Sequence, residues 1–407
     1  MTQRKAALGF IFVTVLIDVT GFGIIIPVVP KLITELTGGT LSEASRYGGW
    51  LMFVYAFMQF LFAPILGGLS DQYGRRKVLL VSLFGLAIDY ILVAFAPYLW
   101  WLFLARLIAG IGGASMTTAS AYIADISTPE KRAQNFGMIG AAFGLGFIVG
   151  PMVGGLLGEF GSRIPFFAAA GLTLLNWLYG FFVVPESLAP ENRRPFSWKR
   201  ANPIGTLLQL RKYPVITGLV ITLLFIYLGQ HATHSTWAYF TMERYGWGEA
   251  EVGYSLGFVG FMIALVQAGG IRAAMKWFGQ TKSVYIGLSF TILGMLLIAM
   301  AQEGWMIYAI MIPYAMGGLA GPALQGIMTS QVSADEQGEL QGGLTSVMSV
   351  TSIVGPPLMT GIFAYFTNPT HEVYLPGAPF YVGSFLCLIA LLFAIKSLTR
   401  LPKTTGQ

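Results

Sequence analysis

Charged residues are scarce in this chain of 407 residues, since Asp, Glu, Lys and Arg together make up 10% of it, and it has only three histidines and one cysteine. The lone Cys387 excludes an internal disulfide bond. Hydrophobic residues make up 55% of the chain, so it cannot cover an ordinary soluble domain with a polar surface. The composition indicates a polytopic membrane protein whose surroundings are the lipid bilayer.

Long apolar runs are abundant. A helix needs roughly 20 apolar residues to cross the hydrocarbon of a bilayer, and twelve such runs occur in the sequence. We therefore expect an all-α membrane protein with twelve transmembrane helices. The runs are Leu8–Val29, Tyr47–Leu69, Val78–Pro97, Leu99–Tyr122, Ala133–Leu157, Pro165–Val184, Pro214–Thr236, Val252–Ala273, Ser283–Met300, Trp305–Met328, Leu340–Phe366 and Pro379–Ser397.

The basic residues predict the orientation, because Lys and Arg favour cytoplasmic loops. If the N-terminus is inside, most of the 24 basic residues fall in cytoplasmic loops and tails, and only Lys31, Arg46, Arg163 and Arg244 fall outside. Both termini are thus predicted to be cytoplasmic. This asymmetry accounts for the net charge of +6, so we expect no nucleic-acid partner.

The polar stretch near the middle predicts two related halves. We expect an N-terminal six-helix bundle at 1–184, a cytoplasmic linker at 185–212, and a C-terminal six-helix bundle with a cytoplasmic tail at 213–407. Features recur at a nearly constant offset, which favours a duplication giving parallel repeats over chance agreement among abundant glycines. The recurring pairs are Arg75–Lys77 with Gln280–Lys282, Trp101 with Trp305, Gly112/Gly113 with Gly317/Gly318, and Gly150-Pro151 with Gly355-Pro356.

The densest cluster of charge is GGLSDQYGRRK at Gly67–Lys77. Gly68 and Gly74 allow close approach and unusual backbone angles, and Asp71 can lie against a helix N-terminus. With Arg75 and Arg76 next to them, these residues predict a constrained cytoplasmic loop rather than a simple connection.

Glycines recur every fourth residue at Gly146, Gly150, Gly154 and Gly158, so one face of the fifth helix carries no side chains. Such a face permits close packing, and the eighth helix, with Gly253 and Gly257, is the expected partner. Simple packing is one interpretation. The other is that this face slides between the halves, with Pro151 weakening the backbone beside it.

Only Asp18, Asp89 and Arg106 are ionisable residues well inside the apolar runs, where a charge costs about 2.5–3.5 kcal/mol. Asp89 and Arg106 lie at a similar predicted depth in the membrane, counted from the outer ends of their helices. They could therefore pair, either as a static structural ion pair or as part of a switch. A buried carboxyl gains affinity for protons, and a nearby cation opposes that gain. We therefore expect these three residues to couple proton movement to the movement of a substrate.

Other candidates for a substrate cavity are polar side chains within the runs: Tyr55, Gln59, Gln230, His231, His234, Gln267 and Gln325. A satisfied hydrogen bond between helices is the competing interpretation for each. His231 and His234 are spaced like two metal ligands, but no third ligand is nearby in the sequence, so no metal site is expected.

Three segments resemble the signature motifs of the major facilitator superfamily: the Gly67–Lys77 loop, Leu104–Asp125, and GLGFIVGPMVGG at Gly144–Gly155. The third resembles the motif of the antiporter branch. LIDVTGFGIIIPVVP at Leu16–Pro30, LAIDYILVAFA at Leu86–Ala96 and GPALQGIM at Gly321–Met328 are similar to bacterial tetracycline-resistance efflux proteins.

The resemblance implies a drug–proton antiporter of the bacterial inner membrane, driven by the proton gradient without a cofactor and acting as a monomer on a small molecule. It implies that Gln59 and Gln267 lie around the substrate. It also implies that Asp71 faces the helix near Gly338, that Arg75 pairs with Asp125, and that these loop contacts, with Gly150 and Pro151, belong to a gate.

The chain departs from the tetracycline exporters in its ninth helix, where GLSFTILGM at Gly287–Met295 has Thr291 in place of an acid. Helix eight reads FMIALVQ, without the histidine that some members carry before the glutamine. The sequence therefore leaves open a transporter of a physiological metabolite or lipid. A membrane enzyme or sensor is disfavoured, since no nucleophile–base pair, phosphate loop or metal cluster occurs.

Overall fold

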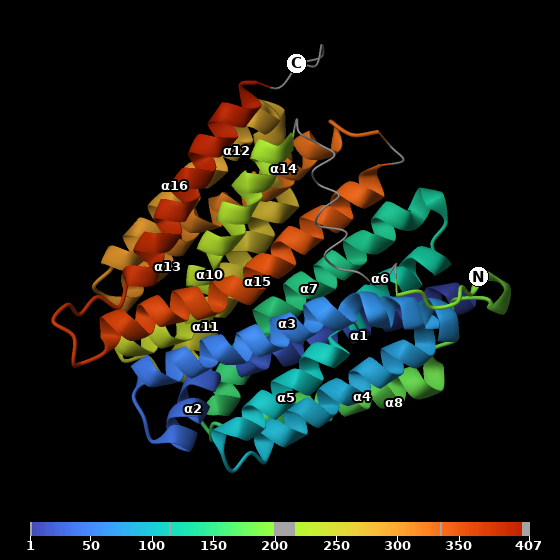
Figure 1. Ribbon diagram of the computed structural model, residues 1–407, viewed down its shortest axis with the longest axis horizontal. Helices are drawn as coiled ribbons and strands as arrows, with labels where there is room; N and C mark the ends of the chain where they lie inside the picture. The colour runs from blue at the N-terminus through green and yellow to red at the C-terminus, as the bar shows by residue number, and fades with distance from the viewer. Residues whose placement is uncertain (1, 114, 199–215, 334–335, 401–407) are drawn as a thin grey trace. The chain divides into compact units, whose positions relative to one another are not determined.

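The computed structural model describes residues 2–113, 115–198, 216–333 and 336–400 (Figure 1). These residues form helices and short connections, with no strand among them. The chain divides into two compact units: residues 1–202 with 247–260, and residues 203–246 with 261–407. Part of the expected 185–212 linker lies outside the described residues, and the predicted domain boundaries stay predictions.

The described residues of the first unit form eight α-helices in its N-terminal stretch, one short 3₁₀ helix, and most of α11. An additional helix, α2, follows the first run because Pro27 interrupts the backbone hydrogen bonds and Pro30 suits the start of a new helix. The elements are α1 (Thr2–Ile25), α2 (Val29–Thr37), α3 (Leu41–Tyr73), α4 (Arg75–Ala94), α5 (Leu99–Gly112), α6 (Ser115–Ile126), α7 (Pro129–Gly158), α8 (Ile164–Val183), η1 (Pro190–Asn192) and α11 (Glu249–Leu265).

The second unit takes the remaining elements. One of them, η4, is a single π-helical segment that continues α11 into α12. The elements are α10 (Thr217–Tyr245), η4 (Val266–Gly270), α12 (Ile271–Met300), α13 (Gly304–Ala315), η5 (Met316–Leu319), α14 (Ala320–Thr329), α15 (Gln337–Thr367) and α16 (Ala378–Leu398).

Ten helical segments of the described chain are long and apolar enough to cross a membrane. One of them, Glu249–Met300, has 52 residues, or roughly 78 Å at 1.5 Å per residue, far more than a bilayer of about 30 Å needs. It bends at Gly279, whose φ of 73° and ψ of 173° are not helical. The 29-residue α10 is not among the ten. The number twelve therefore stays a prediction.

Helix packing repeats from one unit to the other. In the first unit α1 packs on α7 and α8, and α4 packs on α8; in the second, α10 packs on α15 and α16, and α12 packs on α16. The predicted glycine pairs also agree, because the fourth crossing is interrupted after Gly112 in the first unit and at Gly317 and Gly318 of η5 in the second. The repeat expected from the sequence is therefore present in the packing.

The glycine stripe of α7 faces α1, not the predicted partner. A Cβ at Gly150 would lie 2.7 Å from the backbone oxygen of Thr20, and one at Gly154 would overlap the backbone oxygen of Ile24. Without side chains on this face, the two backbones can pack at close range, which is how helices associate in lipid.

The expected partner, α11, lies against the adjacent face of α7. Gly253 approaches Pro151 and Gly257 approaches Met152, while within the stripe Gly158 alone also contacts α11. The prediction that the stripe packs on Gly253 and Gly257 was therefore wrong for most of its length, because a four-residue spacing reveals a bare face but not the helix that covers it.

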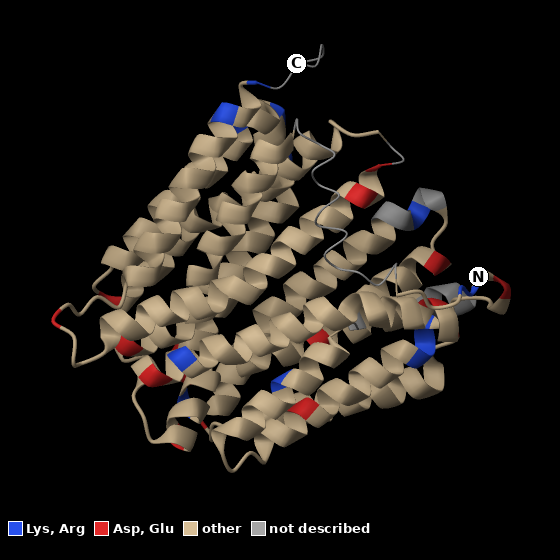
Figure 2. Ribbon diagram, viewed as in Figure 1, with Lys and Arg blue, Asp and Glu red and all other residues tan. Residues whose placement is uncertain are grey.

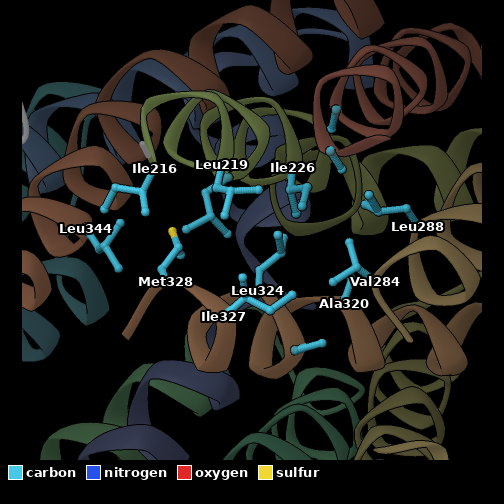
Figure 3. Packing of buried hydrophobic residues seen from close by; sticks show 14 of the residues in the cluster. Ile216, Leu219, Ile226, Val284, Leu288, Ala320, Leu324, Ile327, Met328 and Leu344 are labelled. Atoms are coloured by element: carbon cyan, nitrogen blue, oxygen red, sulfur yellow. The ribbon is translucent and has the colours of Figure 1, made fainter. Parts of the chain in front are cut away.

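Each unit has its own apolar core. Figure 3 shows the core of the second unit, where Leu219 of α10 and Leu324 of α14 lie among the buried side chains. In the first unit Phe10, Leu83 and Tyr122 belong to the equivalent cluster on α1, α4 and α6. Figure 2 shows how few Asp, Glu, Lys and Arg residues interrupt the helices, which makes those that do candidates for function.

Candidate functional site

The first unit holds a buried ion pair. Arg106 on α5 donates from Nη2 to Oδ2 of Asp89 on α4, as their similar predicted depths suggested. The Asp89 side chain is 1% exposed and the Arg106 side chain 14% exposed. Oδ1 of Asp89 is buried and has no hydrogen-bond partner among the described residues, so the arginine satisfies only one of the two carboxylate oxygens.

Asp18 belongs to the same group of charges. It lies on α1, half-buried, and Tyr55 and Tyr90 each interact electrostatically with Asp18, Asp89 and Arg106. Tyr90 is 5% exposed, and its hydroxyl lies 3.3 Å from where a Cβ of Gly21 would be, one turn along α1 from Asp18. Two carboxylates, one guanidinium and two phenols from four helices thus converge.

Glycines on α5 bring the polar side chains of α3 to this cluster. A Cβ at Gly110 would lie 2.7 Å from the backbone oxygen of Tyr55, so α3 can approach only because the side chain is missing. Gln59 then donates from Nε2 to the backbone oxygen of Gly113 at 3.1 Å and to the Tyr55 hydroxyl at 3.4 Å. Gln59 therefore has the interhelical hydrogen bond that was its competing interpretation.

The other predicted cavity residues lie in the second unit. His234, Gln267 and Gln325 are exposed, and Gln230 is partly exposed. Gln325 of α14 donates to Oε1 of Gln341 on α15 at 3.0 Å. Gln267 lies in the π-helical η4. Helices of this type are rare in proteins, and those that occur are often found at functional sites. The structure does not define how these residues lie relative to the cluster of the first unit, so their roles stay predictions.

Thr291, which stands where an acid was expected from the resemblance, is 5% exposed. Its hydroxyl donates to the backbone oxygen of Gly287 at 3.1 Å. The residue is therefore satisfied within its own helix.

Arg75 organises the Gly67–Lys77 loop. Its Nε lies 3.1 Å from Oδ2 of Asp125, and its Nη1 contacts Asp71 at 2.5 Å and Ser70 Oγ at 2.6 Å. The pairing of Arg75 with Asp125 that the resemblance implied is therefore present. The implied contact of Asp71 near Gly338 involves the other unit and stays a prediction.

Glu186, just after α8, contacts the Gly67–Lys77 loop, and the sequence analysis missed it. Its Oε1 accepts from the backbone N–H groups of Arg75 at 2.8 Å, Ser187 at 3.1 Å and Leu188 at 3.2 Å. Gly74, with φ of 103°, leaves the space that this carboxylate occupies. An anion at the N-terminus of α4 is favourable, so Glu186 fixes the loop to the end of the first bundle.

The linker continues along the same loop. The backbone N–H of Arg194 donates to the backbone oxygen of Asp71 at 3.1 Å, and that of Phe196 donates to Oε1 of Gln72 at 3.2 Å. The ring of Phe196 lies on Gly68, where a Cβ would come within 2.9 Å of it. Gly68 thus makes room for the linker.

A further ion pair lies away from this loop. Lys31 Nζ of α2 lies 2.7 Å from Oε1 of Glu249 at the start of α11. Glu35, one turn further along α2, accepts a hydrogen bond from the Ser162 hydroxyl. These contacts could not be predicted from the sequence, because the two partners of each contact share no motif and no predicted run.

Two repeated helical units with buried acid–base groups in an apolar bundle define a multi-pass membrane protein of the transporter class. The chain belongs to the Major Facilitator Superfamily, whose family profile matches residues 11–321. This membership identifies the chain as a transporter and not an enzyme.

Relatives match over nearly the whole length. The class C tetracycline resistance protein of Escherichia coli is 41% identical over 390 residues, covering 96% of this chain and 97% of that protein. The class B protein of Escherichia coli is 37% identical over 405 residues, covering 97% and 96%. The hippocampus abundant transcript 1 protein of Homo sapiens is 27% identical over 375 residues, covering 85% and 76%.

Solved structures share the fold. The human organic anion transporter TETRAN matches with a TM-score of 0.72 and 21% identity, covering 96% of this chain and 99% of that one. The nucleoside transporter NupG matches with a TM-score of 0.77 and 14% identity, covering 97% and 99%. At these identities the likeness concerns the fold alone.

Proposed function

We propose that this chain is a proton-coupled secondary active transporter that exports a drug-like small molecule of the tetracycline type by alternating access. The tetracycline resistance proteins that match it over almost their full length support this substrate class. The observation that carries the coupling mechanism is the cluster of Asp18, Asp89 and Arg106 in the first unit.

The charges of this cluster explain exchange. With both acids ionised and Arg106 positive, the three groups carry one net negative charge in an apolar bundle, where an uncompensated charge is unfavourable. A proton on Asp18 neutralises that charge, and so does a cationic group of a substrate, but the two together leave an excess positive charge. Proton and substrate therefore bind in alternation, and proton entry drives substrate exit.

The other predicted residues have supporting roles in this proposal. Tyr55, Gln59, Gln230, His234, Gln267 and Gln325 bind substrate. The Gly67–Lys77 loop, through Asp71, Arg75 and Arg76 and with Asp125, Gly150 and Pro151, controls access from the cytoplasm. The protein works as a monomer in the bacterial inner membrane with both termini cytoplasmic, and the proton gradient supplies the energy without a bound cofactor.

The test is proton movement in proteoliposomes on addition of tetracycline. The unaltered chain should release protons when the drug is added, and Asp18→Asn should bind the drug while losing the proton signal. Glu191→Gln, an exposed acid of the linker, is the control and should behave like the unaltered chain. Normal coupling in Asp18→Asn would refute the assignment, and a proton signal with a metabolite but not with any drug would overturn the substrate class.

A further inference from the structure

His231 of α10 lies at a weak point of α15. A Cβ added at Gly355 would overlap the imidazole ring of His231 and lie 2.9 Å from its Cβ. Gly355 is followed by Pro356 and Pro357, both inside the helix. The ring therefore packs on bare backbone at the one place in α15 where two successive residues lack an N–H.

The prolines leave acceptors beside this contact. Proline cannot donate to the carbonyl four residues earlier, so the backbone oxygens of Ser352 and Ile353 lose their helical partners. Proline inside a helix also favours bending. Because α15 packs on α10, we expect the Gly355 contact to be the point at which α15 bends most easily against α10.

The first unit makes the equivalent contact without a titratable group. There α1 meets α7 at Gly150-Pro151 through its backbone: a Cβ at Gly150 would lie 2.7 Å from the backbone oxygen of Thr20, and one at Gly23 would lie 2.8 Å from Cδ of Pro151. Since α1–α7 and α10–α15 are corresponding helix pairs, the two repeats differ at this step by an imidazole. Packing alone does not require a histidine at the α10–α15 contact, because the corresponding α1–α7 contact is made with a glycine.

Among the described residues of the second unit, no acid lies beside His231. The nearest titratable side chain is His234, whose ring is 6.2 Å away and nearly perpendicular. Residues 340–364 of α15 and all of α14 contain no titratable residue. The other titratable residues of the neighbouring helices are Glu339 and Tyr365 near the two ends of α15, Tyr308 and Tyr314 of α13, and Tyr381, Cys387 and, in its last turn, Lys396 of α16. An imidazolium packed on Gly355 would face no acid, and a second one at His234 would repel it.

We propose that the α10–α15 contact of the second unit is a proton-binding hinge. His231 is neutral while its ring lies on Gly355. When the helices part at this step, the partly exposed ring gains access to more water and to the carbonyl oxygens of Ser352 and Ile353, and His231 binds a proton. Low pH therefore favours the parted state. The further step, that this second site takes part in transport, rests on the proposed function.

The three histidines of the chain make a direct test possible. Protein labelled with ¹⁵N-histidine and carrying a tag without histidine is placed in lipid nanodiscs, and its imidazole signals are recorded over roughly pH 5 to 8. The variants His231→Gln, His234→Gln and His371→Gln assign the signals. Amide hydrogen exchange of α15, corrected for the intrinsic effect of pH, is measured on the same samples.

We expect an imidazolium signal of His231 to grow as the pH falls, together with roughly threefold faster exchange around Gly355. His231→Gln should abolish the pH dependence of exchange, and His371→Gln should leave it intact. A His231 that stays neutral over the whole range, or the same pH-dependent exchange in His231→Gln, would overturn the hinge. No substrate is used, so either result is independent of the Asp18 experiment.

Discussion

At the scale of single residues, the Asp89–Arg106 pair is expected to affect stability through the charge that remains when one partner is removed, more than through the lost contact itself. Removing one partner of a buried ion pair leaves an isolated charge and costs about 3–5 kcal/mol, whereas removing both is far less harmful. We expect Arg106→Gln and Asp89→Asn each to lower the thermal unfolding temperature, and the double variant to regain most of the loss. Differential scanning fluorimetry of the four proteins in the same detergent measures this.

Transport should not return with stability in the double variant, because its cluster retains Asp18 as the sole charged group. Restored drug–proton exchange in that protein would show that Asp89 and Arg106 stabilise the structure but take no part in coupling. Double-variant losses equal to the sum of the single losses would show that the two side chains do not interact.

Much of this site follows from residue types in the sequence, because a charge in an apolar run is conspicuous. Asp18, Asp89 and Arg106 stand out for that reason, and a depth estimate suffices to suggest the pairing. Tyr90 is inconspicuous, since a tyrosine in an apolar run is ordinary core material until Gly21 and Asp18 are seen beside it. Glu186 is missed for the opposite reason: an acid in a polar linker resembles a solvent-exposed residue.

At the scale of elements, Glu186 acts as the N-terminal cap of α4 although it follows α8. Glu186→Ala should destabilise the first turn of α4 by about 0.5–2 kcal/mol, as loss of a cap does. Amide hydrogen exchange at Arg75 and Arg76, whose N–H groups donate to Glu186, should speed up accordingly. Glu191→Ala, an exposed acid in the same linker, is the matched control, and equal protection in both variants would contradict the capping role.

The contact between α1 and α7 depends on the glycine stripe. Gly154→Ala places a methyl group against the backbone oxygen of Ile24, and overpacking of this kind costs about 1–3 kcal/mol. Gly144→Ala, in the same helix but with open space around it, should instead be neutral or gain up to about 1 kcal/mol from helix propensity. Opposite changes in the unfolding temperature are expected, and a loss shared by both variants would mean that the stripe is not the cause.

The sequence predicts that the helices exist better than it predicts where they begin, end or bend. Apolar length predicts the crossings, but the break after Gly112 and the bend at Gly279 depend on backbone angles that only neighbouring helices determine. The partner of the α7 stripe could not be found for the same reason. Periodicity describes one helix, whereas packing is a property of two.

At the scale of the whole molecule, the distribution of basic residues predicts that the linker faces the cytoplasm and that the loop after α15 faces outward. Cys387 is the single cysteine and is fully buried in α16, so Cys387→Ser provides a background without reactive thiols. Glu191→Cys and Glu372→Cys then place one thiol each at exposed positions of the linker and the outer loop. A membrane-impermeant maleimide should label Glu372→Cys in intact cells and Glu191→Cys only in inverted vesicles. Labelling of Glu191→Cys from outside would show that the linker faces outward and that the predicted orientation is wrong. The proposed direction of export would then be wrong as well, because it assumes that the linker lies on the cytoplasmic side of the proton gradient.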